Sequence, residues 1–235
     1  MRLTGAEIKK NLRPNIWQKL TGQPANITII PFDEKCLGPN NYDIHLYPEL
    51  KVFTATIPNG MKPALEFIPG HEYSMRDWFV SDEAYAEYLA HPENFDQRNP
   101  KFMVNPFENK ETVSIMIPKD GLILSPQVGY LGATVECVGG RNLIPSIDGK
   151  SSIGRNFILT HHTAGGGHDG FCGQWTLEIA VMYPTLVKAG MRIGQFYFDK
   201  FVGKRKSYDK NNLAGYNNQT GPKSPPPIPV SDELV

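Results

Sequence analysis

Apolar and polar residues alternate along several short stretches of the chain, a pattern typical of strands with one buried face. Residues 42–47 (YDIHLY) place a tyrosine, an isoleucine and a leucine on one face, and an aspartate and a histidine on the other. Residues 175–182 (WTLEIAVM) alternate in the same way. Other short apolar runs predict further strands at 51–57, 113–117, 130–138, 156–161 and 193–202.

Helical signals are confined to two short segments. Thr4 followed by Glu7 is a capping-box pattern and predicts a helix at the N-terminus. Residues 81–90 begin with Ser81 as an N-cap, followed by acidic residues in the first turn. No interval between the strands after residue 113 has room for a crossover helix, so the sequence predicts a mainly β protein, an antiparallel barrel or sandwich.

The predicted organisation is a single β domain over 1–222 and a proline-rich, flexible tail over 223–235. The partly helical segment 70–112 is predicted to be an insertion on the β scaffold. Two interpretations of this insertion stay open. It is either a surface elaboration that covers a barrel end, or a lid or partner site built on its aromatic residues Trp78, Phe79, Tyr85 and Tyr88.

Composition narrows the function classes. Lysine plus arginine and aspartate plus glutamate both number 24, so the formal net charge is zero, which excludes binding of duplex nucleic acid by bulk charge. No apolar run reaches the ~20 residues of a membrane helix, and the first residues lack the apolar core of a secretory signal. Cys36, Cys137 and Cys172 form no CxxC pair, which argues against a disulfide framework or a structural zinc site. We expect a reduced, cytoplasmic protein with no membrane partner.

Glu178 is a lone carboxylate on the less apolar face of the predicted strand 175–182, beside small or apolar groups. Desolvation in such a place would raise its pKa, as a general base near neutral pH requires. The alternative is an outward-facing, solvated glutamate.

The segment 148–155 (DGKSSIGR) combines two glycines, two serines and two cations. This composition suits an anionic phosphate ligand, although it is also common in turns. The phosphate-binding signature GxxxxGK[ST] does not occur in the chain. The spacing GxGxxG occurs at 165–170 (GGGHDG), but a predicted strand and not a helix follows it, so mononucleotide and dinucleotide folds are poor candidates.

Four ordered motifs resemble those of the dCTP deaminase branch of the trimeric dUTPase superfamily. They are DGKSSIGR, HHTAGGGHDGFCGQWTLE, AGMRIGQFYF and, at 216–222, YNNQTGP. The resemblance is strong over about 118–222. It extends weakly to the N-terminus, where GPNNYDIHL is similar to an early strand of the family.

The resemblance implies a distorted antiparallel β-barrel or jelly-roll, assembled as a homotrimer with active sites between subunits. It further implies zinc-independent hydrolysis of dCTP to dUTP and ammonia. The zinc deaminases combine HxE with PCxxC, and this combination does not occur here. Mg²⁺ would arrive bound to the nucleotide triphosphate.

Carried over by position, the resemblance makes Glu178 the general base, with Ser151 and Arg155 as the other catalytic residues. It assigns the phosphate-facing loop to Lys150 and Ser152. The remaining substrate-binding positions are Ala164, His168, Asp169, Phe171, Thr176, Tyr208 and Gln219.

The sequence departs from the family at two of these motifs. His168 stands where relatives have an aspartate, with Asp169 displaced by one position. Gly215 replaces a lysine before the C-terminal tyrosine. The residues considered as substitutes for that lysine are Lys204, Arg205, Lys206 and Lys210.

Two other functions stay open. A dUTP diphosphatase, or a bifunctional enzyme that forms dUMP and pyrophosphate, would use Asp169 to activate water at the α-phosphate. A catalytically inactive nucleotide-binding trimer would also fit the departures from the family.

Overall fold

The computed structural model describes residues 1–204, 206–208 and 215–228, and its strands pair antiparallel throughout this part of the chain. The central sheet has the order β5-β3-β7-β10-β9, with β1 also pairing with β7. Its strands are β1 (Ile27–Ile30), β3 (Glu49–Phe53), β5 (Thr112–Met116), β7 (Tyr130–Gly140), β9 (Ile158–Leu159) and β10 (Cys172–Val181).

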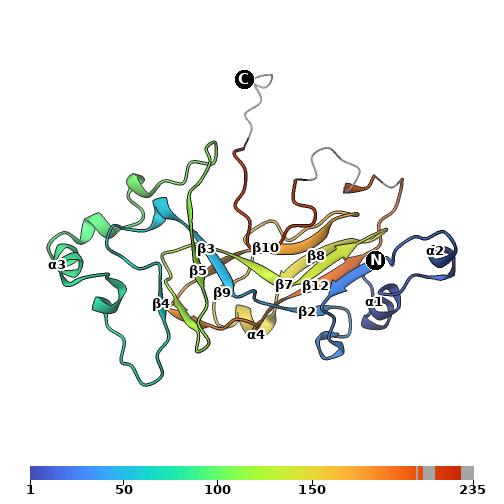
Figure 1. The fold of residues 1–235 in the computed structure, drawn as a ribbon, viewed down its shortest axis with the longest axis horizontal. Helices are drawn as coiled ribbons and strands as arrows, with labels where there is room; N and C mark the ends of the chain where they lie inside the picture. Colours follow the sequence, from blue (N-terminus) through green and yellow to red (C-terminus); the bar gives the residue numbers. More distant parts are fainter. Residues whose placement is uncertain (205, 209–214, 229–235) are drawn as a thin grey trace.

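Two smaller sheets complete the β structure. One has the order β11-β6-β4 and the other β2-β12-β8. Their strands are β2 (Tyr42–His45), β4 (Ala64–Glu66), β6 (Leu122–Leu124), β8 (Ile144–Gly149), β11 (Thr185–Val187) and β12 (Arg192–Asp199). The long strands β7, β8, β10 and β12 overlap in the middle of the molecule, where the sheet curls into a half-barrel (Figure 1). The predicted fold class, a distorted antiparallel β-barrel, is therefore confirmed.

The helices are short and peripheral. The α-helices are α1 (Gly5–Asn11), α2 (Ile16–Leu20), α3 (Asp82–Ala90) and α4 (Ser151–Gly154). Single 3₁₀ turns are η1 (Glu34–Cys36), η2 (Thr54–Thr56), η3 (Met75–Trp78), η4 (Pro92–Phe95) and η5 (Pro100–Phe102). None of the helices in the described ranges is long and apolar enough to cross a membrane.

The predicted helix starts are confirmed by their caps. The hydroxyl of Thr4 accepts the N–H of Glu7, and the hydroxyl of Ser81 accepts the N–H of Ala84. Each bond satisfies one of the N–H groups that a helix start leaves without an intrahelical partner.

Alternation along β10 is also confirmed. Trp175, Leu177 and Ile179 are buried in the core, whereas Thr176 and Glu178 are half-buried on the opposite face. In β2 the picture is different, because Asp43, predicted to lie on the open face, is only 6% exposed. The side chains of Lys150 and Arg192 pair with it.

Three predicted strands are shorter than expected. The chain leaves β3 after Phe53, where the Thr56 hydroxyl donates to the Phe53 carbonyl and closes η2. Only Ile158–Leu159 of the predicted strand 156–161 pairs with β10, and β12 ends at Asp199 rather than at residue 202.

The segment 70–112 is partly helical, as predicted, and lies at the end of the molecule opposite α1 and α2 (Figure 1). Its aromatic residues pack on one another: the Phe79 ring is 5.1 Å from Tyr88 and 5.6 Å from Phe95. Phe79 and Phe95 are buried, so the insertion has a small aromatic core of its own, and both interpretations of it stay predictions.

Candidate functional site

A cavity of about 600 Å³ lies on the half-buried face of β10, and we call it the glutamate cavity. Its walls come from β10, from the segment 164–168 and from residues 215–228, which we call the strap. The predicted site residues that line it are Ala164, His168, Phe171, Thr176, Glu178, Tyr208 and Gln219.

Glu178 is the only carboxylate among the described residues that line the glutamate cavity. Its Oε2 accepts the backbone N–H of His162 at 3.0 Å. This bond fixes the side chain, and within the described ranges Oε1 has no hydrogen-bond partner. A fixed carboxylate with one oxygen open to the cavity is the geometry that a general base needs.

The opposite wall depends on a glycine. A Cβ at Gly167 would lie 2.1 Å from the indole ring of Trp175, so only glycine lets this loop approach β10 so closely. Further along the wall the His168 ring stacks on Tyr208 at 5.3 Å, and Phe171 packs edge-on against Trp175 at 5.1 Å. This wall presents flat, apolar surfaces, against which a base or a sugar can pack.

The strap is held to the half-buried face of β10 by a short series of hydrogen bonds. Gln219 Nε2 donates to the Gln174 carbonyl at 2.5 Å and to Thr176 Oγ1 at 3.2 Å. The N–H of Gly221 donates to Gln174 Oε1 at 2.6 Å. The Gln219 Oε1 atom is buried and has no partner within the described ranges, so it is a free acceptor at the cavity wall.

Lys223 also lines the glutamate cavity, and the sequence motifs give no signal for it. Its Nζ donates to the carbonyl of Gly215 at 2.8 Å and lies 5.1 Å from the Tyr216 ring. The ammonium group of Lys223 therefore lies beside Gly215, the position at which the family resemblance expects a lysine. Lys223 lies beyond the last motif residue, so only the path of the strap reveals this.

A second cavity, of about 540 Å³, contains the 150–155 segment, and we call it the loop cavity. It is lined by Lys150, Ser151, Ser152 and Arg155, together with Cys36, Asn41, Asp43 and Gln195. The structure thus separates these four predicted residues from Glu178, because within one chain they line different cavities.

Lys150 is engaged in an ion pair. Its Nζ lies 2.6 Å from Asp43 Oδ2, and Arg192 approaches the same oxygen at 3.4 Å. Lys150 and Arg192 therefore cover the buried carboxylate of Asp43 in β2. Asp43 therefore neutralises part of the charge of Lys150, and the role of Lys150 in the phosphate-facing loop stays a prediction.

Ser151, Ser152 and Arg155 are exposed, and their side chains make no hydrogen bond or ion pair within the described ranges. The segment was expected to be a loop, but Ser151–Gly154 forms the single turn α4. Gln195 of β12 supports this turn by donating to the Gly149 carbonyl at 2.9 Å. The loop cavity therefore presents one guanidinium and two hydroxyls on a braced backbone.

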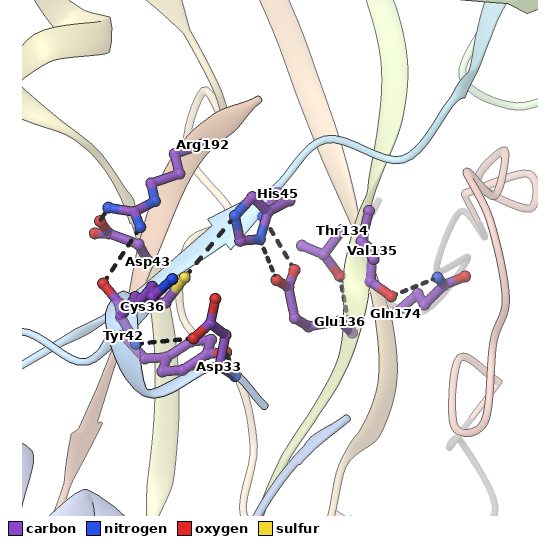
Figure 2. A network of polar contacts seen from close by, with 11 residues as sticks. Asp33, Cys36, Tyr42, Asp43, His45, Thr134, Val135, Glu136, Gln174 and Arg192 are labelled. Carbon is purple, nitrogen blue, oxygen red and sulfur yellow. Dashed lines mark hydrogen bonds and ion pairs between the residues drawn. The ribbon is translucent and has the colours of Figure 1, made fainter. Parts of the chain in front are cut away.

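Behind the loop cavity, β2 is tied to the central sheet by buried polar contacts (Figure 2). Glu136 accepts from both the N–H and the ring Nδ1 of His45, at 3.0 and 2.5 Å. His45 Nε2 lies 3.8 Å from the sulfur of Cys36. Burial raises the pKa of the Cys36 thiol, so it stays protonated near neutral pH.

Asp169 does not line the glutamate cavity. It is buried, and its Oδ1 accepts the N–H of Asn142 at 2.7 Å. It faces a third cavity of about 600 Å³, which it shares with His168, Lys204 and Lys206. Of the other basic residues considered, Arg205 and Lys210 lie outside the described residues.

Within the described residues, no group of three or more His, Cys, Asp or Glu side chains is placed to hold a metal ion. The side-chain donors that line the glutamate cavity are the carboxylate of Glu178, the imidazole of His168, the amide of Gln219 and three hydroxyls. A metal that acts there would have to bring most of its ligands with it, as an ion bound to a triphosphate does.

Comparison with known proteins identifies relatives over most of the chain. Residues 80–201 match the family model described as dCTP deaminase-like. A protein of Leptospira biflexa named "dCTP deaminase, dUMP-forming" is 33% identical over 208 residues, which is 88% of this chain and 87% of the relative. A protein of Clostridium beijerinckii with the same name is 32% identical over 221 residues, which is 94% of this chain and 93% of the relative.

Among solved structures, the 2'-deoxycytidine 5'-triphosphate deaminase from Agrobacterium tumefaciens matches with a TM-score of 0.48 and 16% sequence identity. That match covers 85% of this chain and 48% of the solved chain.

Proposed function

Since the chain belongs to the dCTP deaminase-like family, we propose that it is a hydrolase that deaminates the cytosine of dCTP, with Glu178 as the general base. The supporting observation is the lone carboxylate of the glutamate cavity, fixed by His162 and open at Oε1. Water attacks C4 of the base while Glu178 takes its proton. Glu178 then passes this proton to the amino group, which leaves as ammonia, and the second proton of the water ends on N3, so that C4 becomes a carbonyl.

The substrate is proposed to be a deoxycytidine nucleotide rather than a nucleic-acid polymer. Phe171, Tyr208 and His168 offer surfaces for the base and sugar, and the backbone at Ala164 borders the same space. The phosphates would extend towards Lys204, Lys206 and Lys223, where the positive charge lies. In this proposal Mg²⁺ enters on the triphosphate, and no zinc takes part.

The catalytic unit is proposed to be a homotrimer with its active sites between subunits. Its basis is the separation of Glu178 from Ser151 and Arg155 within one chain, because a neighbouring copy can bring its loop cavity to the glutamate cavity. A surface that another copy would cover also exists. Exposed apolar side chains lie beside both motifs, at Phe157, Leu159, Met182 and Tyr183.

The test is to identify the products of purified protein with dCTP and Mg²⁺ by chromatography, together with an ammonia assay. We expect ammonia and a uracil nucleotide, and we expect Glu178→Gln to lower turnover by about 10²- to 10⁴-fold. Glu87→Gln, on exposed helix α3, is the matched control. Nucleotide binding without ammonia release at any pH would identify the inactive, nucleotide-binding trimer instead.

A second candidate function is the complete conversion of dCTP to dUMP and pyrophosphate. Its basis is the name "dUMP-forming" shared by relatives that are 33% and 32% identical. Asp169 is the residue proposed from the sequence for the phosphate step, but its carboxylate is buried against Asn142. It would have to move to reach a nucleotide in the glutamate cavity.

The two candidates differ in one product. Pyrophosphate equal in amount to ammonia would establish the dUMP-forming reaction, whereas accumulation of dUTP would establish deamination alone. In the first case, an Asp169→Asn variant that still releases pyrophosphate would exclude Asp169 as the group that activates water.

A further inference from the structure

Cys137 and Cys172 are distant in sequence but adjacent in the sheet. Both are free and half-buried, and their sulfur atoms lie 3.5 Å apart. They project from the same face of the paired strands β7 and β10, where Cys172 lies opposite Gly139. A Cβ at Gly139 would come within 2.9 Å of the Cys172 sulfur, so the glycine provides the space that this sulfur occupies.

The environment of the pair separates the two thiols chemically. A hydrogen bond from the Cys137 thiol, with a smaller contribution from the Thr28 hydroxyl, lowers the pKa of Cys172 to about 7. The same contact and burial raise the pKa of Cys137. Near neutral pH a substantial fraction of Cys172 is therefore thiolate, and Cys137 is a thiol within reach of it. This is the arrangement of a reactive cysteine beside a resolving cysteine.

We propose that Cys172 is a hydroperoxide-reactive cysteine and that Cys137 resolves it to a disulfide. The Cys172 thiolate attacks one oxygen of the peroxide, the O–O bond breaks, and a sulfenic acid and water or an alcohol are formed. The Cys137 sulfur then attacks the Cys172 sulfur and expels the hydroxyl, which leaves as water with the Cys137 proton. Both sulfurs are oxidised by one electron each, and the peroxide is reduced by two.

The disulfide would act on the strap. A disulfide bond requires a sulfur separation of about 2.05 Å, so closing the 3.5 Å gap draws the start of β10 towards β7. That end of β10 holds the strap, because the Cys172 N–H donates to Asn217 Oδ1 at 2.9 Å and its carbonyl accepts from the Asn218 N–H at 2.7 Å. We therefore expect oxidation to displace neighbouring Tyr216 and Gln219 in the glutamate cavity and to raise KM for the nucleotide.

Cys36 supplies an internal control. It is buried, its pKa is raised, and its sulfur is in contact with His45 rather than with another cysteine. It should survive a peroxide treatment that consumes the other two thiols.

The experiment treats the full-length protein with hydrogen peroxide and blocks the remaining thiols with iodoacetamide under denaturing conditions. Trypsin cleavage after lysine and arginine then places Cys36, Cys137 and Cys172 in the separate peptides 36–51, 120–141 and 156–188. We expect the second and third peptides to be linked until dithiothreitol is added, with the first peptide carrying the iodoacetamide group. Oxidation of Cys36 before the pair, or oxidation of Cys172 to a sulfinic acid without a cross-link, would overturn the proposal.

Two variants separate the steps. In Cys137→Ser the reaction should stop at the sulfenic acid, which dimedone traps on peptide 156–188. In Cys172→Ser peroxide should leave residue 137 unmodified, and a Cys137 that still reacts would show that the roles are reversed. Thiol mapping does not depend on the proposed function. The rise in KM does depend on it, and a disulfide that leaves KM unchanged would refute only the coupling to the strap.

Discussion

The glutamate cavity and the loop cavity are similar in size but complementary in content. The first has one carboxylate, apolar walls and a strap held over β10. The second has an arginine and two hydroxyls on an exposed turn, with a salt bridge behind them. Neither cavity alone contains all three predicted catalytic residues, Glu178, Ser151 and Arg155.

The cysteines near the two cavities also differ in their ionisation. The loop cavity includes the buried Cys36, whose pKa is raised, whereas Cys172 lies under the strap with a lowered pKa. Burial favours the neutral thiol in the first case, and a hydrogen bond from a second thiol favours the thiolate in the second. The pKa of the same residue type is thus shifted in opposite directions because its neighbours differ.

The largest expected effect is on turnover, in variants that test whether the two cavities form two halves of one active site. Glu178→Gln and Arg155→Ala should each lower turnover by about 10²-fold or more. If the halves come from neighbouring copies, subunit exchange between the two variants should restore about a quarter of the wild-type activity, because one site in four then pairs two intact halves. Turnover after mixing, with the mass of the assembly as a multiple of 26.3 kDa, is the measurement. No recovery in mixed oligomers would place both halves in one subunit.

Asp43→Asn tests the salt bridge behind the loop cavity. The variant leaves Lys150 and Arg192 without their carboxylate, and loss of such charge-assisted bonds costs about 1.5–3 kcal/mol. We expect a decrease of this size in the free energy of unfolding in urea. Asp120→Asn, at an exposed position, is the control. Equal stability of the two variants would mean that the pair contributes nothing to folding.

The pH dependence of alkylation tests the difference in pKa between Cys172 and Cys36. A lowered pKa means that the Cys172 thiolate accumulates as pH rises through about 7. Its alkylation rate with iodoacetamide should rise about tenfold from pH 6 to pH 8 and then level off, because only the thiolate reacts. Cys36 should remain slow throughout this range, since its pKa is raised. Mass spectrometry of the three tryptic peptides measures both rates, and a Cys172 midpoint near 9 would contradict the assigned ionisation.

The smallest expected effect concerns the strap. Gln219→Ala removes the bonds to the Gln174 carbonyl and Thr176 Oγ1. A net loss of about 1 kcal/mol corresponds to about a fivefold rise in KM, with little change in kcat, because the strap closes over the substrate without touching C4. Gln127→Ala, at an exposed position that does not line the glutamate cavity, is a matched control. A fall in kcat with constant KM would instead place Gln219 at the reacting base.

Much of the fold was predictable because its signals are local. The alternation of β10 placed Glu178 on the face opposite the core, and Thr4 and Ser81 marked helix starts through bonds to residues three positions away. The ends of strands were less predictable. β3 ends at Phe53 because a turn closed by Thr56 competes with the pairing of the strand. The pattern of apolar residues gives no sign of this competition.

The candidate site was predictable as a set of residues but not as an arrangement. The motifs identified Glu178, Ser151 and Arg155, yet the structure places the first in one cavity and the other two in another. The motifs gave no sign that Lys150 is paired with Asp43. Nor did they include Lys223, which lies after the last motif and reaches Gly215 only through the course of the strap.

The sequence by itself determined which face of β10 is buried, where the helices capped by Thr4 and Ser81 begin and which family the chain resembles, because these depend on residue order over a few positions. Only the tertiary structure decided which distant groups meet. Asp43 neutralises Lys150 across 107 positions, and Cys137 lowers the pKa of Cys172 across 35. Such pairings are set by strand order and register, and charge and ionisation depend on separations of a few ångströms in space rather than on separation along the chain.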